Sequence, residues 1–409
     1  MKKLLIIGFV WPEPNATAAG SRMLQLIKLF QKDGYTITFG STASKTETTF
    51  NLENIAINTV KIELNNTSFD DFIKELNPKI VVFDRYLTEE QFGWRVSENC
   101  PNALRILDTE DLHFLRNARI TAFKQQTKVT LPILMNEVAK REIASIYRCD
   151  LTLIISSYEM KLLKKVFKIN KSLVHYIPFL VDPIEPSTIV TLPSFEKRAN
   201  FMTIGNFRHE PNWNAVLYLK NDIWPLIRKQ LPMAEMHIYG AYVPNKAQQL
   251  HNVKEGFLIK GWAENAETTF KNSKVCLAPL RFGAGLKGKL IDAMKYGAPS
   301  VTTSIGAEAM HQNLPWNGFI CDLPQDFVDR AVELYTKKEV WSEAQKNGFT
   351  ILKKCYDKAT YEEKLLKKIV KIEHKIEKHR LKNFMGALLM HHSLKSTKYL
   401  AKWIEEKNK

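Results

Sequence analysis

Short apolar runs alternate with amphipathic segments along most of the chain, and this alternation limits the fold more than any other feature. The first run, residues 4–10, is continuously apolar, as expected of a parallel strand buried on both faces. A loop rich in Pro, Asn, Ala and Gly follows, and residues 21–30 then carry apolar side chains at helical spacing. Strands that alternate with helices in this way indicate an α/β protein with parallel sheets.

The alternation occurs in two series, which are separated by a proline-rich stretch. The stretch has prolines at 178, 183, 186 and 193 and no apolar periodicity, which is typical of a linker. We therefore predict two doubly wound domains, with a ligand site in the cleft between them at the carboxyl ends of the strands. The predicted segments are a first Rossmann-like domain (1–182), a linker (183–198), a second Rossmann-like domain (199–350), a closing helix that returns to the first domain (351–378) and a basic helical tail (379–409).

The charge of the chain is unevenly distributed. Of 409 residues, 59 are Lys or Arg and 43 are Asp or Glu, a net charge of +16, and residues 351–409 hold 16 of the former against 7 of the latter. Such an excess indicates an anionic partner, although a lysine-rich solvent surface explains it equally well. The tail also carries Phe384, Tyr399 and Trp403, a mixture that suits an interfacial helix on an anionic membrane. The alternative is a tail that packs on the first domain.

The cysteines and the first residues bear on the compartment. Five widely spaced cysteines without a Cys-x-x-Cys pair disfavour a disulfide framework or a zinc site and fit a reducing cytoplasm. The first apolar run ends at Trp11-Pro12 without a small-residue cleavage site, so we interpret it as a strand and not as a signal peptide. No run reaches the roughly 18 to 20 apolar residues that span a bilayer. We expect a soluble cytoplasmic protein that lies at most on the inner face of the membrane.

Residues 278–294, directly after a predicted strand, hold the largest group of residues that could bind a ligand. The cluster contains Gly283, Gly285, Lys287, Gly288, Lys289 and Asp292. Glycines let a backbone approach a ligand closely, and a helix N-terminus offers free N–H groups and a positive dipole. Two ammonium groups there can neutralise a diphosphate, and a carboxylate just inside the helix can accept hydrogen bonds from ribose hydroxyls. The alternative is a glycine-rich turn with surface lysines.

This cluster resembles the donor-nucleotide signature of the family 4-like glycosyltransferases, in their bacterial sugar transferase branch. Other segments agree in order, namely residues 12–23, 108–116, 156–159, 177–182, 205–212 and 297–303. The resemblance covers residues 1 to about 350 and implies the GT-B architecture of two facing Rossmann-like domains. It implies that the first domain (1–182) lies on the acceptor side and that the second (199–350) binds the nucleotide sugar. It also implies a retaining glycosyltransferase of the hexosyltransferase type, without metal or cofactor. Such an enzyme moves a sugar from a nucleotide-diphosphate-sugar donor to a saccharide or lipid-linked acceptor in surface polysaccharide or glycan biosynthesis.

The resemblance also implies roles for single residues. The catalytic group comprises Lys287 and Arg208, as cations for the departing diphosphate, and His113, as a contact of the transferred sugar. The donor-binding group comprises Gly20, Arg281, Gly283, Gly285, Lys289 and Asp292. In the family pattern Glu-x7-Glu, the second acid binds the ribose and the first contacts the donor sugar. This chain has Asp292 at the second position and Ala284 at the first. The resemblance therefore implies ribose binding by Asp292 and no sugar contact from the side chain of residue 284.

Several alternatives remain open at this point. His113 can instead be held by Asp111 at a helix start, Arg208 can be a surface arginine, and Gly20 can serve only to permit a tight turn. For the whole chain, the rivals are a nucleotide-sugar epimerase of the same architecture and a non-catalytic protein that binds sugar nucleotides. A nucleic-acid-binding function depends on charge alone, since no recognised binding motif accompanies it, and we expect no nucleic-acid partner.

Overall fold

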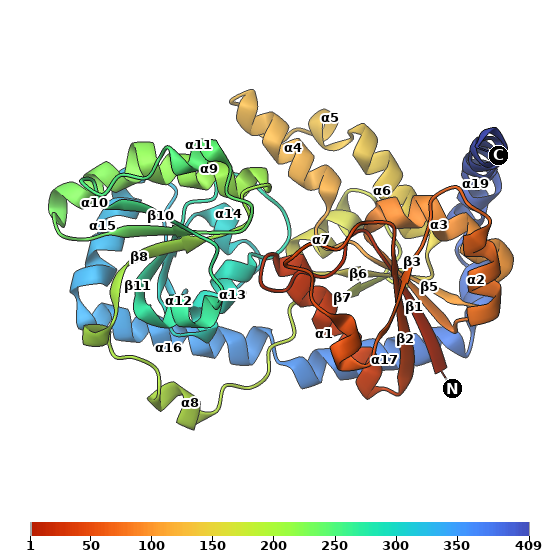
Figure 1. Cartoon of the computed structure of the whole chain (residues 1–409), viewed down its shortest axis with the longest axis horizontal. Coiled ribbons are helices and arrows are strands. Elements are labelled where there is room, and N and C mark those ends of the chain that lie inside the picture. Colours follow the sequence, from red (N-terminus) through yellow and green to blue (C-terminus); the bar gives the residue numbers. More distant parts are fainter. Residues whose placement is uncertain (1, 409) are drawn as a thin grey trace.

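The computed structural model describes residues 2–408, apart from the side chains of residues 392–394, and shows two α/β domains beside each other (Figure 1). Met1 and Lys409, which begin the predicted first domain and end the predicted tail, lie outside the described residues. The strands of the first domain are β1 (Lys2–Gly8), β2 (Tyr35–Ser41), β3 (Asn58–Lys61), β4 (Ile80–Asp84), β5 (Leu104–Asp108), β6 (Leu151–Ile154) and β7 (Val174–Tyr176). They form one parallel seven-stranded sheet in the order β3-β2-β1-β4-β5-β6-β7.

Helices cover both faces of this sheet. They are α1 (Ala18–Lys32), η1 (Leu52–Ile55), α2 (Ser68–Leu76), α3 (Arg85–Asn99), α4 (His113–Lys124), α5 (Leu131–Leu134), α6 (Glu137–Arg148), α7 (Ser157–Lys165) and, from the far end of the chain, α17 (Lys358–Glu373). Along β1, Leu4 and Ile6 pack in the core shared with α1 and α17, whereas Leu5 and Ile7 pack in the core shared with α2, α3 and α4. Because successive side chains of a strand point to opposite faces, the continuous apolar run fills two cores at once.

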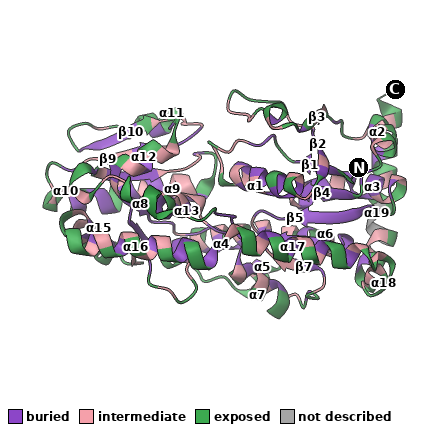
Figure 2. Cartoon of the chain, turned by 90° about the horizontal axis from the view of Figure 1, so that it is seen from below, coloured by how far each residue is buried: buried purple, intermediate pink, exposed green. Residues whose placement is uncertain are grey.

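The second domain repeats this plan with six strands. They are β8 (Ala199–Ile204), β9 (Met236–Tyr239), β10 (Phe257–Gly261), β11 (Ser273–Ala278), β12 (Ser300–Thr302) and β13 (Gly318–Ile320), in the order β10-β9-β8-β11-β12-β13. Its helices are α9 (Glu210–Tyr218), the π-helix η3 (Leu219–Ile223), α10 (Trp224–Gln230), α11 (Asn245–Gln248), α12 (Ala266–Asn272), α13 (Gly288–Lys295), α14 (Ser304–Ala307), α15 (Pro324–Thr336) and α16 (Lys338–Cys355). Figure 2 shows strands of both domains buried beneath helices with exposed outer faces.

The linker holds more structure than its composition predicts. It contains α8 (Pro186–Val190) and the 3-10 turn η2 (Phe195–Lys197). Arg198, at its end, is buried and donates hydrogen bonds to the carbonyl oxygens of Phe270 and Tyr296 at 2.9 Å each. A buried guanidinium needs such acceptors, so this residue fixes the end of the linker to the second domain.

The chain returns to the first domain at Tyr356, and not at the predicted boundary of 350, because α16 continues to Cys355 with Ile351 and Leu352 buried. There the returning chain pairs with the outgoing one: the Val181 N–H donates to Tyr356 O at 3.0 Å, and the Lys358 N–H donates to Val181 O at 3.1 Å. The outgoing and returning segments that connect the two domains are thus hydrogen-bonded to each other.

The last helices are α18 (Ile376–Leu381) and α19 (Phe384–Lys407), and α19 packs against α3 and α6 at the outer end of the first domain (Figure 1). The predicted break at 378 therefore falls within α18. Among the described residues, no helix is both long and apolar enough to cross a membrane. The predicted fold class, two Rossmann-like domains with parallel sheets and a helical C-terminal tail, is confirmed.

Candidate functional site

The two domains contact each other along the carboxyl ends of their strands. Tyr242 of the second domain donates its hydroxyl proton to the Glu13 carboxylate of the first, with O···O distances of 2.8 and 2.9 Å. Nearby, the first turns of α1 and α13 meet so closely that a Cβ on Gly288 would lie 2.7 Å from Ala18 Cβ. Two helix N-termini therefore converge on the cleft, and their dipoles make it attractive to an anion.

The loop between β11 and α13 forms the second-domain side of the cleft. Gly283 and Gly285 have φ angles of +145° and +63°, conformations that favour glycine. A Cβ on Gly285 would also lie 2.8 Å from Asp111 Cβ of the first domain. These two glycines let the loop turn sharply and touch the opposite domain.

Two lysines begin the helix that follows this loop. Lys287 is the N-cap residue of α13, and its Nζ donates to Ala284 O at 3.1 Å and to Gly285 O at 2.8 Å. Lys289 Nζ donates to Asn212 Oδ1 at 2.9 Å. Burial lowers the pKa of both lysines to about 8, because a charged ammonium is poorly solvated there. Burial likewise raises the pKa of Asp292, one turn further on, to about 6. The structure thus gathers Gly283, Gly285, Lys287, Lys289 and Asp292 in one place.

A small cavity of about 60 Å³ lies on the first-domain side, at the carboxyl ends of β1 and β4. Its lining comprises Val10, Trp11, Pro12, Glu13, Thr17, Ala19, Gly20, Met23, Asp84, Arg85 and Glu110. Arg85 and Glu110 have φ angles of +69° and +60°, which cost energy for non-glycine residues and gather at functional sites.

Carboxylates at this cavity are short of hydrogen-bond donors. Asp84 Oδ1 and Glu110 Oε1, of two lining residues, are buried and have no hydrogen-bond partner among the described residues, and the same holds for Oδ2 of Asp108, which does not line the cavity. Burial, reinforced by the charge of Asp108, raises the pKa of Glu110 well above its usual value. Buried polar atoms without partners are costly, and a carboxyl group with a raised pKa both donates and accepts hydrogen bonds, so the cavity is suited to a ligand with hydroxyl groups.

His113 is the first residue of α4, and its ring is held in place by its neighbours. Its Nδ1 lies 3.1 Å from Asp111 O and 3.4 Å from Glu142 Oε1, and its ring contacts that of Tyr86 edge to face. His113 is therefore held at a helix start by its neighbours, as the alternative interpretation of the sequence had it. A contact between His113 and the transferred sugar stays a prediction.

The other predicted site residues have structural partners as well. The Arg208 guanidinium stacks 3.7 Å from the Tyr242 ring centroid at the cleft. Arg281 lies between the rings of Phe123 and Tyr218 and donates to Asn214 Oδ1 at 2.8 Å, so it contributes to interdomain packing.

Gly20 lies in the first turn of α1. It allows close packing, since a Cβ there would lie within 2.6 Å of the Glu13 backbone, and its N–H is already bonded to Thr17 Oγ1. Donor binding by Gly20, Arg208 and Arg281 stays a prediction.

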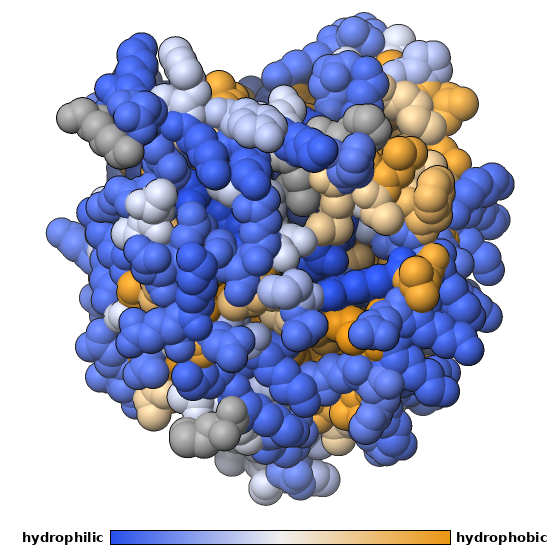
Figure 3. All heavy atoms as spheres, turned by 90° about the vertical axis from the view of Figure 1, so that its right-hand side faces the viewer, coloured by the Kyte–Doolittle hydropathy of each residue, from blue (hydrophilic) through white to orange (hydrophobic). Residues whose placement is uncertain are grey.

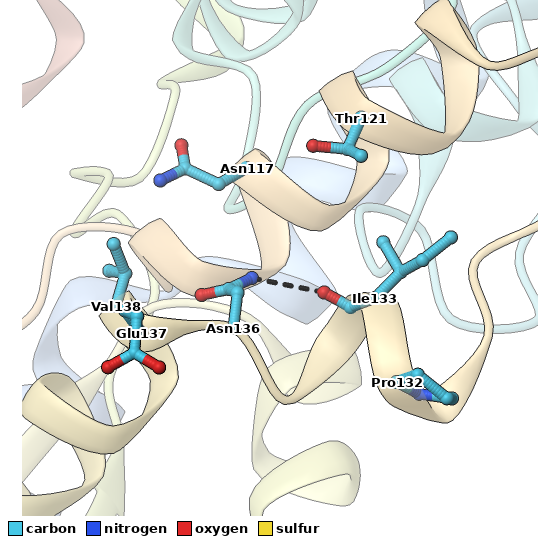
Figure 4. A pocket seen from close by; sticks show the side chains of 7 residues that line it. All are labelled: Asn117, Thr121, Pro132, Ile133, Asn136, Glu137 and Val138. Carbon is cyan, nitrogen blue, oxygen red and sulfur yellow. Dashed lines mark hydrogen bonds between the residues drawn. The ribbon is translucent and has the colours of Figure 1, made fainter.

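A second hollow, of about 360 Å³, lies between α4, α5 and the start of α6 (Figure 4). Asn117 and Thr121 of α4 face Ile133 and Asn136 across it, and Asn136 Nδ2 donates to Ile133 O at 3.2 Å. None of the predicted site residues lines this hollow.

Three residues of the interface were not predicted from the sequence. Arg119 of α4 donates to both carboxylate oxygens of Glu308, at 2.8 and 2.7 Å, and to Gly283 O at 2.7 Å. Glu159 of α7 is fully buried, and its Oε1 accepts from Leu112 N at 3.1 Å and from Gly285 N at 2.9 Å. Both groups tie the first domain directly to the glycine loop of the second.

Replacing Arg119 by alanine is expected to open the cleft. The variant leaves Glu308 half-buried and unpaired, and truncating one partner of a buried charge pair costs about 2–5 kcal/mol. We expect a larger radius of gyration in small-angle X-ray scattering than for the parent protein. Lys124→Ala is the matched control, because its interdomain pair with Glu210 is exposed on both sides (63% and 46%) and such pairs contribute little. An equal radius for the parent and Arg119→Ala would contradict this role.

Comparison with known proteins gives a family match within the second domain and several structures of similar fold. Residues 198–337 match the family model of glycosyl transferases group 1. The fold resembles sucrose-phosphate synthase from Thermosynechococcus elongatus, with a TM-score of 0.67, 14% identity and coverage of 91% of this chain and 99% of the other. It also resembles Anabaena HepE in complex with UDP and glucose (TM-score 0.67, 12% identity, 90% and 100% covered) and the pneumococcal O-GlcNAc transferase GtfA in complex with UDP and GlcNAc (0.68, 11%, 91% and 99%). A search of curated proteins by sequence gives no match.

At these identities the structural likeness defines the fold, which is the GT-B architecture. The family match in the second domain defines the class, a glycosyltransferase that uses a nucleotide sugar. The family match of residues 198–337 and the GT-B fold agree with a family 4-like GT-B glycosyltransferase, and the resemblance seen in the sequence is confirmed.

Proposed function

We propose that this protein transfers a hexosyl group from a nucleotide-diphosphate-sugar to a saccharide or lipid-linked acceptor in surface glycan or polysaccharide assembly, with retention of the anomeric configuration. The observation that carries the proposal is the loop of Gly283 and Gly285 with Lys287 and Lys289 at the N-terminus of α13. In this proposal the free N–H groups of the helix and the two ammonium groups hold the diphosphate.

Transfer needs stabilisation of the charge that develops on the departing diphosphate, and preorganised cations provide it most effectively. The position of Lys287 at the start of α13, and of Arg208 on the Tyr242 ring at the cleft, supports this part of the proposal. Since these groups supply the positive charge, the proposed reaction requires neither a metal ion nor a cofactor. Asp292, inside the first turns of α13, accepts hydrogen bonds from the ribose.

The first domain supplies the acceptor side of the proposed reaction. His113 contacts the transferred sugar, and the unpaired oxygens of Asp84 and Glu110 accept hydrogen bonds from acceptor hydroxyls. Ala284 cannot provide the carboxylate that the family pattern has at this position. In this proposal, backbone groups of residues 283–286 contact the donor sugar instead.

A donor panel tests the proposal. UDP-sugars come first, because the HepE and GtfA structures contain UDP, and a ligand at 100 times its dissociation constant stabilises a protein by about 2.7 kcal/mol. We expect a nucleotide-dependent rise in Tm, release of nucleoside diphosphate only with acceptor present, and an α-linked product from an α-linked donor by NMR. Absence of any nucleotide-dependent shift contradicts the proposal. Binding without transfer supports the non-catalytic alternative, and an epimerised sugar nucleotide supports the epimerase.

The affinity for UDP is expected to fall as the pH rises above about 8. In the free protein, burial lowers the pKa of Lys287 and Lys289 to about 8, and a bound diphosphate favours their charged forms. Binding above pH 8 therefore requires proton uptake, which weakens it by up to about tenfold per pH unit for each lysine. Titration calorimetry from pH 7 to 9, in two buffers of different ionisation enthalpy, measures both the affinity and the proton uptake. A Kd independent of pH over this range would contradict the placement of the diphosphate.

A further inference from the structure

Helices α18 and α19 pack on the first domain through one face only. Arg380 donates to both carboxylate oxygens of Asp150 at 2.8 Å, and Asn383 Nδ2 donates to Tyr147 O at 2.7 Å. A Cβ on Gly386 would lie 2.2 Å from Tyr147 O, and Ala401 is 5% exposed. Gly386 thus lets α19 approach α6 closely, and the buried Ala401 marks a second point at which α19 is closely packed.

Polar contacts fix the rotation of α19 about its axis. Glu405 pairs with the buried Arg95 of α3, and Lys398 Nζ lies 2.5 Å from Glu98 Oε1. Arg105 Nη1 lies 3.2 Å from the sulfur of Met390. Because these contacts all lie on one side of α19, its other side faces away from the protein.

The outward side carries large apolar and aromatic side chains. Phe384, Leu388, Tyr399 and Trp403 follow one another at intervals of four or eleven residues, so they form one stripe along the helix. Phe384 is 75% exposed and Trp403 is 60% exposed. Leu381, Met385 and Leu400 extend this stripe. Figure 3, which views this end of the molecule, shows apolar side chains gathered within a mostly hydrophilic surface.

Exposed lysines surround this apolar stripe. They are Lys375, Lys378, Lys382, Lys395, Lys402 and Lys407, against the exposed acids Glu377 and Glu406. Aromatic and aliphatic groups beside lysines suit the boundary between anionic headgroups and acyl chains, where the apolar groups are buried and the ammonium groups stay near phosphate. A second copy of the chain is a poorer partner, since it would bring two basic surfaces together.

We propose that this outward surface of α18 and α19, the tail face, docks on an anionic lipid bilayer. Helix α19, with 24 residues and a length of roughly 36 Å at about 1.5 Å per residue, lies in the plane of the headgroups. Lipid binding by the tail face does not depend on the proposed sugar transfer. Its failure would leave that function unaffected.

Vesicle sedimentation of the full chain tests the proposal, with phosphatidylglycerol–phosphatidylcholine vesicles compared with pure phosphatidylcholine. We expect binding to the anionic vesicles that is weaker at high salt. A charge variant, Lys395→Glu/Lys402→Glu, should bind at least about tenfold more weakly, since each basic residue near the surface contributes about fivefold. An apolar variant, Phe384→Ser/Leu388→Ser/Trp403→Ser, should also bind at least about tenfold more weakly, because it removes three apolar side chains that the bilayer would bury. Neither variant alters the contacts that hold α19 on α3 and α6.

Two control variants carry the same kinds of substitution, apolar to Ser and Lys to Glu, at exposed positions of the second domain and the linker. Val190→Ser/Met233→Ser/Val253→Ser removes three exposed apolar side chains, and Lys229→Glu/Lys346→Glu reverses two exposed charges. Both controls should bind vesicles as the parent does. No binding of the parent to anionic vesicles, equal losses in the controls, or no effect of the apolar variant overturns the proposal. A change from dimer to monomer in the apolar variant, by light scattering, with vesicle binding intact, assigns the face to a second copy instead.

Discussion

Lys287→Ala is expected to lower kcat/KM by about 10²–10³, the usual loss when one preorganised donor for developing charge is removed. Among the described residues, the hydrogen bonds of Lys287 Nζ go to carbonyl oxygens of its own loop, Ala284 O and Gly285 O. The variant should therefore fold normally, with a Tm within a few degrees of the parent. Initial rates with the best donor of the panel and a thermal melt measure the two quantities.

Lys295→Ala is the matched control, because Lys295 is exposed in the last turn of the same helix. We expect near-parent rates for this variant. Lys287→Arg, which keeps the positive charge with a different shape, should retain more activity than Lys287→Ala. Near-normal turnover of Lys287→Ala would remove the basis for placing the diphosphate at α13.

The fold could be predicted because its determinants are local. The alternation of side chains along residues 4–7 fills two cores, and the same pattern recurs in β4, β5 and β6. The end of the second domain, predicted at residue 350, could not be placed as accurately. Nothing in the local pattern separates Ile351 and Leu352, which pack in the second domain, from Leu365 and Ile369, which pack in the first.

In the candidate site, too, residues close together in the sequence could be predicted and contacts between distant residues could not. Gly283, Gly285, Lys287 and Lys289 are neighbours in sequence, so their grouping was visible without a structure. The pair of Arg119 and Glu308 joins residues that are 189 positions apart, and no local pattern marks it.

Glu159 is even misleading in the sequence, because Ser156-x-x-Glu159 is the pattern of a capping box. Ser156 makes no side-chain cap in the structure. The carboxylate of Glu159 instead reaches Leu112 N and Gly285 N.

Glu159→Ala is expected to lower the free energy of unfolding by roughly 2–4 kcal/mol, since it leaves two buried N–H groups without an acceptor. It should also lower kcat/KM at least tenfold, because Glu159 positions both the start of α4, next to His113, and the loop that holds Lys287. Urea unfolding and steady-state kinetics measure these losses. Glu53→Ala, a change of an exposed glutamate, is the control and should have little effect.

Glu159→Gln separates positioning from charge. Burial, with the charge of Asp111, raises the pKa of Glu159 to about 8, so the folded protein holds this proton at neutral pH whereas the unfolded chain, with a pKa of about 4.3, does not. The stability that protonated Glu159 contributes is complete below about pH 4.3 and is lost as the pH rises toward 8, at about 1.4 kcal/mol per pH unit. Glutamine keeps the acceptor and does not titrate, so this variant should retain activity and gain stability relative to the parent as the pH rises from 5 to 8. A stability difference that stays constant over this range would show that Glu159 is ionised in the folded protein and acts as a charge.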